Sequence, residues 1–79
     1  MALRIAVVPI GDGWAVRTTG LDNEMLFQAG AKAEAAARDL ARRSAAAGRS
    51  AEVTIFLRDG AVAGRFLHAP QAPSGAIPA

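Results

Sequence analysis

The sequence predicts a small α+β fold, in which an antiparallel sheet of two hairpins plus a short third strand carries one helix on one face. Three observations support this prediction. An alanine-rich segment at residues 31–47 has the composition of a helix, and strand-like alternation flanks it on both sides. Turn residues divide each flanking segment, which gives the order β-β-β-α-β-β. The 79 residues are therefore expected to form a single α+β domain with a thin core.

The first hairpin is expected over residues 3–19. Apolar residues recur at the period of a strand, at Leu3, Ile5 and Val7. Gly11-Asp12-Gly13 marks the turn, and Trp14 restarts the chain as a strand. A tryptophan at this place is more often a core anchor than a platform for stacking a base. Pro9 cannot donate to a strand ladder, so the first strand ends there or is an edge there.

Two further segments complete the predicted sheet. A turn at residues 20–23 precedes a short third strand at 24–28, with Leu26 on the side opposite to its neighbours. After the helix, alternation resumes in a strand whose inner residues are Val53, Ile55 and Leu57. Asp59-Gly60 favours a type I′ turn into a return strand at 61–68. In that strand one face is expected to carry Val62, Gly64 and Phe66.

The helix itself has a weak apolar face. Its stripe consists of small residues apart from one leucine, at Ala33, Ala37, Leu40, Ala41 and Ser44. Alanines bury little area, so the stripe stabilises the domain less than leucines would. The other face is charged, and Glu34–Arg38 and Asp39–Arg43 have the spacing of ion pairs. Gly48 is a suitable C-terminal stop.

Large apolar residues are also expected on the face of the sheet that the helix leaves uncovered. If the helix covers one set of alternating residues, the neighbours of that set point outward. The candidates for self-association on this face are Ile10, Leu26, Phe56 and Leu67. A homo-oligomer formed by packing two sheets would supply burial that the thin core lacks. The alternative interpretation is that they are scattered surface residues, which are normal.

The arginines near the helix suggest a second kind of surface. The candidates for nucleic-acid contact are Arg38, Arg42, Arg43 and Arg49. Arg17, Arg58 and Arg65 of the sheet could add to them. The formal net charge is only +2, and acidic residues lie between the arginines, which weakens the field. A solvated helix face that partly neutralises itself is therefore the favoured interpretation.

The sequence holds no motif for catalysis or for a cofactor. There is no cysteine, and the single histidine, His68, cannot build a site of several histidines. The aspartates Asp12, Asp22 and Asp59 lie at turns, where they are expected for structural reasons. We therefore predict a non-enzymatic protein without cofactor or metal. The lack of cysteine and of any long apolar segment fits a cytoplasmic chain.

Residues 1–68 are expected to form the α+β domain. The remaining residues, 69–79, are rich in proline and alanine and have no charged side chain. They are expected to form a C-terminal tail without regular structure.

The chain resembles a family of small uncharacterised bacterial proteins, a domain of unknown function. The resemblance covers about residues 5–66. Its motifs, in order, are Val7-Val8-Pro9, Gly13-Trp14-Ala15-Val16, Ala37-Arg38-Asp39-Leu40-Ala41, and Asp59-Gly60 followed by Val62. The family usually has Thr or Ser as the N-cap of its helix, whereas this chain has Ala29 or Gly30 there. The resemblance implies no activity and no catalytic residues.

The order of three strands and a helix is also similar to the partial double-stranded-RNA-binding-like fold of HicB-type antitoxins, a likeness of topology alone. Three functions follow as hypotheses. The favoured one is a non-catalytic, self-associating interaction or regulatory module. The others are a nucleic-acid-binding protein that uses the arginine face and an antitoxin-like partner of another small protein.

Overall fold

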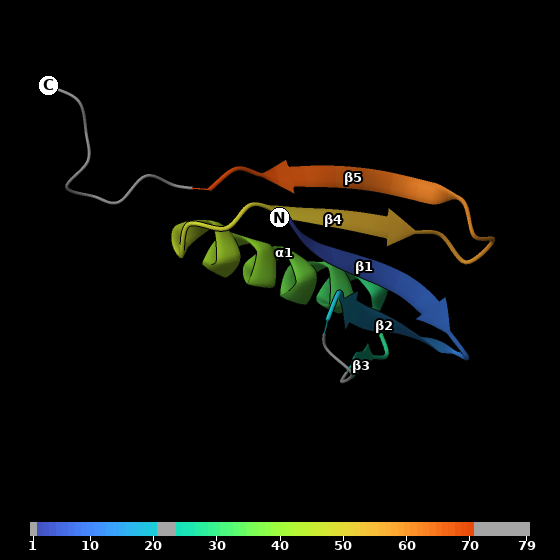
Figure 1. Cartoon of the computed structure of the whole chain (residues 1–79). Coiled ribbons are helices and arrows are strands. Elements are labelled where there is room, and N and C mark those ends of the chain that lie inside the picture. The colour runs from blue at the N-terminus through green and yellow to red at the C-terminus, as the bar shows by residue number, and fades with distance from the viewer. Residues whose placement is uncertain (1, 21–23, 71–79) are drawn as a thin grey trace, which may run out of the picture.

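The computed structural model describes residues 2–20 and 24–70 and confirms the α+β class (Figure 1). Within these residues, one helix and five strands follow each other in the predicted order. Their bounds are β1 Leu3–Ile10, β2 Gly13–Thr18, β3 Met25–Phe27, α1 Gly30–Ala46, β4 Ala51–Phe56 and β5 Val62–His68. Most of the predicted turn at 20–23, and most of the predicted tail at 69–79, lie outside the described residues.

The strands form one sheet in the order β3-β2-β1-β4-β5. Neighbours are antiparallel except at the centre, where β1 and β4 pair in parallel, from Leu3 opposite Ala51 to Val7 opposite Ile55. The sheet is therefore mixed, which differs from the antiparallel sheet that the sequence predicts. The reason is α1, which returns the chain after β3 to the end of the sheet where β1 begins. The next strand must then run in the same direction as β1.

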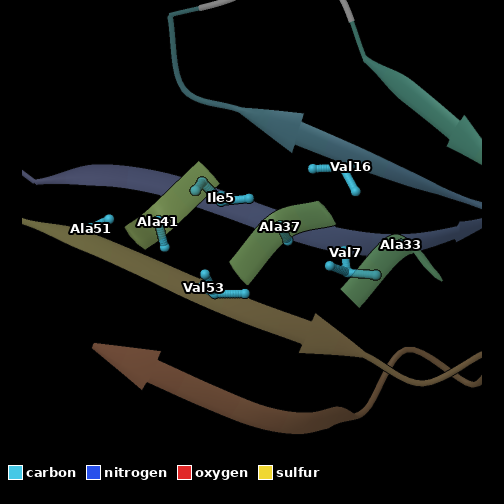
Figure 2. Close-up of a cluster of buried hydrophobic side chains, with 8 residues drawn as sticks. All are labelled: Ile5, Val7, Val16, Ala33, Ala37, Ala41, Ala51 and Val53. Atoms are coloured by element: carbon cyan, nitrogen blue, oxygen red, sulfur yellow. The ribbon is translucent and has the colours of Figure 1, made fainter. Parts of the chain in front are cut away.

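The helix covers one face of the sheet with a row of alanines (Figure 2). The buried row, at most 3% exposed, consists of Ala33, Ala37, Ala41 and Ala45. The most buried side chains of the sheet beneath it are at most 1% exposed, and the largest of these are Ile5, Val7, Val16 and Val53. Leu40 packs only at the margin of this core, and Ser44 is half-buried, so Ala45 belongs to the inner face in their place. The sheet therefore supplies most of the apolar bulk of the core.

The two ends of α1 differ in how their backbone groups are capped. Its N-cap is Ala29, and no side chain donates or accepts a capping hydrogen bond there. At the other end the N–H of Gly48 donates to the carbonyl of Ala45 (3.0 Å), and the N–H of Arg49 donates to that of Ser44 (2.9 Å). Gly48 has φ +91°, the left-handed conformation of a Schellman C-cap. The predicted stop at Gly48 is confirmed.

The second hairpin turns differently from the prediction. β4 ends at Phe56, so Leu57 is 47% exposed in the connection and does not belong to the core. The N–H of Leu57 donates to the carbonyl of Ala61 (2.7 Å), and the N–H of Gly60 donates to that of Leu57 (2.9 Å). A type I′ turn needs positive φ at both central residues, but only Gly60 has it. The loop is a type I turn followed by a left-handed glycine.

The first hairpin and the third strand agree with the prediction. β1 and β2 pair from Ile5 opposite Thr18 to Ile10 opposite Gly13. In β3, Met25 and Phe27 pair with residues of the helix-covered side, and Leu26 pairs on the other side. Trp14 packs against the core, as expected of an anchor. The parallel register with β4 stops before Pro9, so the proline stands where β1 has lost one neighbour.

Candidate interaction surface

The sheet has an outer face opposite α1 (Figure 1), and the strand pairings place a row of apolar residues, one from each strand, across that face. Ala15 pairs with Leu26 on one side and with Val8 on the other, while Phe56 pairs with Val62. The parallel register of β1 and β4 ends with Val7 opposite Ile55, and Val8 and Phe56 are the residues that follow this pair. The apolar stripe, in strand order, consists of Leu26, Ala15, Val8, Phe56 and Val62.

The apolar stripe is most exposed at its two ends. Leu26 is 67% exposed on β3 and Val62 is 50% exposed on β5. Ala15 is 0% exposed, so β2 presents no projecting side chain between Leu26 and Val8. Ile10 lies one step beyond the stripe on the same face of β1 and is 39% exposed. A sheet with one solvated face normally carries polar residues at such positions.

Three of the four residues predicted for self-association lie together. Ile10, Leu26 and Phe56 belong to the apolar stripe or adjoin it. Leu67 does not, because it pairs with Glu52 about 13 Å further along the strands. Val62 was not among the predicted residues. A register shift between Ile55 and Phe56 places it opposite Phe56 rather than on the helix side.

The other half of the outer face is charged. Arg17 donates to Glu24 across β2 and the start of β3 (2.6 Å), and Arg65 lies 3.4 Å from Glu52 across β5 and β4. Arg4, on the central strand, is the neighbour of Glu52 in the register. These five residues, Arg4, Arg17, Glu24, Glu52 and Arg65, form a charged band that lines an open concavity of the sheet. Two of its three arginines, Arg17 and Arg65, pair with the two glutamates, so the band keeps a single excess positive charge.

The helix arginines are paired with carboxylates. Arg38 lies 3.2 Å from Glu34, and Arg43 lies 2.9 Å from Asp39, which confirms both predicted ion pairs. Arg42 lies 3.3 Å from the same Asp39. These contacts reduce the positive potential of the helix face that the nucleic-acid hypothesis requires.

The structure also separates the four predicted contact residues. Arg38 and Arg42 line a depression between α1 and β5, together with Glu34 and His68. The guanidinium of Arg38 stacks 4.3 Å from the ring centroid of Phe66. Arg49 lies past the helix end, at a different depression. Together they do not form a continuous basic surface.

Arg58 has a role that the sequence did not reveal. Its guanidinium donates to the carbonyls of Gly11 (3.1 Å) and Asp12 (2.7 Å), which lie 47 and 46 residues away in the chain. It also stacks 4.8 Å from the ring centroid of Trp14. Arg58 thus ties the loop of the second hairpin to that of the first. No local pattern could have shown this, because the acceptors are backbone atoms of a distant turn.

Catalytic and metal-binding groups do not gather in residues 2–20 and 24–70. No group of three or more His, Cys, Asp or Glu side chains in these ranges could hold a metal ion. Across the same ranges, no helix has the length and apolarity needed to cross a bilayer. The outer face of the sheet is therefore the most distinctive surface of the described structure.

Comparison with known proteins assigns the chain to a family. A family model described as an uncharacterized protein conserved in bacteria, DUF2188, matches residues 5–66. The chain belongs to the DUF2188 family. This confirms the predicted resemblance, and the match includes α1 and all of β2, β3 and β4. No curated protein and no solved structure matches the chain.

The DUF2188 match brings no activity with it, since the family description names none. The structure shows the difference from the family at the start of the helix, because Ala29 is the N-cap and forms no side-chain hydrogen bond there. The turns of both hairpins of this DUF2188 protein lie within the matched range, and so do the residues of its apolar stripe.

Proposed function

We propose that this DUF2188 chain is a non-catalytic interaction module that self-associates through the outer face of its sheet. The observation that carries the proposal is the apolar stripe, which has one residue on each of the five strands and which no helix covers within residues 2–20 and 24–70. Scattered surface residues would not align in one row of the register. The stripe exposes apolar surface most at Leu26 and Val62, and large exposed apolar groups that gather on one face mark an interaction site.

The thin core gives a physical reason for self-association. The helix contributes only methyl groups at its four most buried positions, Ala33, Ala37, Ala41 and Ala45. Small domains with little apolar burial commonly gain stability by oligomerising. Packing a second layer against the outer face would cover the apolar stripe and add the burial that α1 does not supply.

The arginine face supports the nucleic-acid alternative less well. Arg38, Arg42 and Arg43 each have a carboxylate partner, and phosphate would have to compete with it. An antitoxin-like role and a cytoplasmic location stay predictions. A fluorescence anisotropy titration with nucleic acid at low salt tests the alternative, and binding there that weakens steeply with salt would favour it.

Sedimentation equilibrium at micromolar concentration tests the proposal. We expect the parent chain to form an oligomer. Its dissociation constant should rise by about tenfold or more when Leu26→Ser or Val62→Ser removes an apolar group from the stripe. Leu57→Ser is the matched control, because Leu57 is 47% exposed but lies outside the stripe. Circular dichroism should show an unchanged fold in all three variants. A monomeric parent chain would contradict the proposal.

A further inference from the structure

We infer that the partner on the outer face is a second copy of this chain, related by a two-fold axis that runs along β1. This inference rests on the proposed self-association and adds the arrangement. It assigns two contacts: Phe56 packs over the partner's Ala15, and Arg65 meets the partner's Glu24. Both follow from the strand order, with β1 at the centre of the sheet.

The apolar stripe becomes complementary to itself under this rotation. Turning the sheet about β1 exchanges β2 with β4 and β3 with β5. Phe56 projects from β4, while Ala15 on β2 ends in a methyl group that its neighbours cover, so β2 has no large side chain at the same level. Leu26 of one copy then meets the partner's Val62, and Val8 meets its own equivalent. Large groups facing small ones let two layers interdigitate.

The charged band becomes complementary as well. One copy holds the Arg17–Glu24 pair on the β2 and β3 side and the Arg65–Glu52 pair on the β4 and β5 side. The rotation places Arg65 over the partner's Glu24. The two pairs then join into a network of alternating charge, and symmetry repeats it on the other side of the axis. An isolated exposed ion pair contributes little, but a network at an interface contributes more.

Area favours the same arrangement. The outer face spans about 24 Å across the strands and about 20 Å along β1 from Arg4 to Ile10. Two copies that overlap completely would bury on the order of 1,000 Å², which is the lower limit for a specific interface. The apolar stripe alone offers roughly a third of that. The charged band must therefore also be covered.

A two-fold axis across the strands, along the apolar stripe, fits less well. It would place each stripe residue on its own equivalent, so Phe56 would meet the partner's Phe56 and Ala15 the partner's Ala15. Projecting groups would collide while small ones left gaps, and the charged band would extend past the partner. The two arrangements differ in which residues approach each other, and this difference can be measured.

Cross-linking between cysteines distinguishes the arrangements, because the chain has no cysteine of its own. Leu26→Cys and Val62→Cys change exposed residues, so the fold should persist, which circular dichroism checks. A chain with Leu26→Cys and a differently tagged chain with Val62→Cys are mixed and treated with a short bis-maleimide. We expect cross-linked heterodimers, and little cross-linking of either variant with itself. Leu57→Cys serves as the control that should not cross-link.

The outcomes separate the arrangement from the proposed function. Efficient cross-linking of Leu26→Cys with itself, while the parent chain sediments as an oligomer, would overturn the arrangement and leave self-association standing. A monomeric parent chain would overturn both. Charge reversal gives an independent readout: Arg65→Glu should weaken association roughly tenfold, and Arg43→Glu on the helix face should leave it unchanged. An unweakened Arg65→Glu oligomer would also overturn the arrangement.

Discussion

Removal of the Arg58 side chain should destabilise the domain although this side chain is exposed. Arg58→Ala loses hydrogen bonds to the carbonyls of Gly11 and Asp12 and the contact with the ring of Trp14. An exposed cation–π contact contributes about 0.5–1 kcal/mol, and hydrogen bonds from a charged donor contribute a similar amount when water competes. We therefore expect a loss of about 1.5 kcal/mol, which lowers the Tm of a domain of this size by roughly 6–12 °C.

Urea unfolding followed by fluorescence measures this loss directly. Trp14 is the only tryptophan, so its emission reports on both the unfolding and the ring contact. Arg58→Lys keeps the charge but not the planar fork, and should lose most of the same stability. Arg43→Ala is the control, because that arginine is 76% exposed and has only an ion pair of the i,i+4 type. If Arg58→Ala loses no more than Arg43→Ala, the hairpin contact does not stabilise the fold.

Three further predictions concern the stability of the folded chain. Val53→Ala, at a side chain 0% exposed, should cost about 2 kcal/mol in urea unfolding, whereas Leu57→Ala, at one 47% exposed and outside the apolar stripe, should cost well under half as much; equal losses would contradict the core assignment. Gly48→Ala should cost about 1 kcal/mol because its φ is +91°, and a neutral result would contradict the C-cap. Ala29→Asp should gain about 1 kcal/mol in thermal unfolding by supplying the missing N-cap; no gain would mean that the cap is already satisfied.

Local features of the fold were predictable because short-range physics determines them. Helix propensity and the glycine at position 48 located α1 to within a residue at each end. The i,i+4 ion pairs followed from helical geometry alone. Alternation assigned Ile10, Leu26 and Phe56 to the outer face. Where the register slips, this reasoning fails: the shift between Ile55 and Phe56 moved Val62 to the opposite face from the predicted one.

Contacts between distant segments could not be predicted in this way. The pairing of Arg17 with Glu24 depends on the register of β2 and β3, in which Val16 lies opposite Met25, and the sequence pattern did not determine that register. The carbonyl acceptors of Arg58 are invisible in the sequence, since every residue has a carbonyl. The charged band was therefore not predicted, although strand alternation places Arg4 and Arg17 on the same face.

The sequence by itself determined the number and type of elements and, except around the second hairpin, their approximate limits and which residues of each strand share a face. It could do so because period and turn chemistry depend on neighbours in the chain. Only the tertiary structure decided that β1 lies at the centre and pairs in parallel with β4. That choice arises from the return of the chain through α1, a long-range packing event. It aligns separate outward residues into one apolar stripe and one charged band, on which the proposed partner depends.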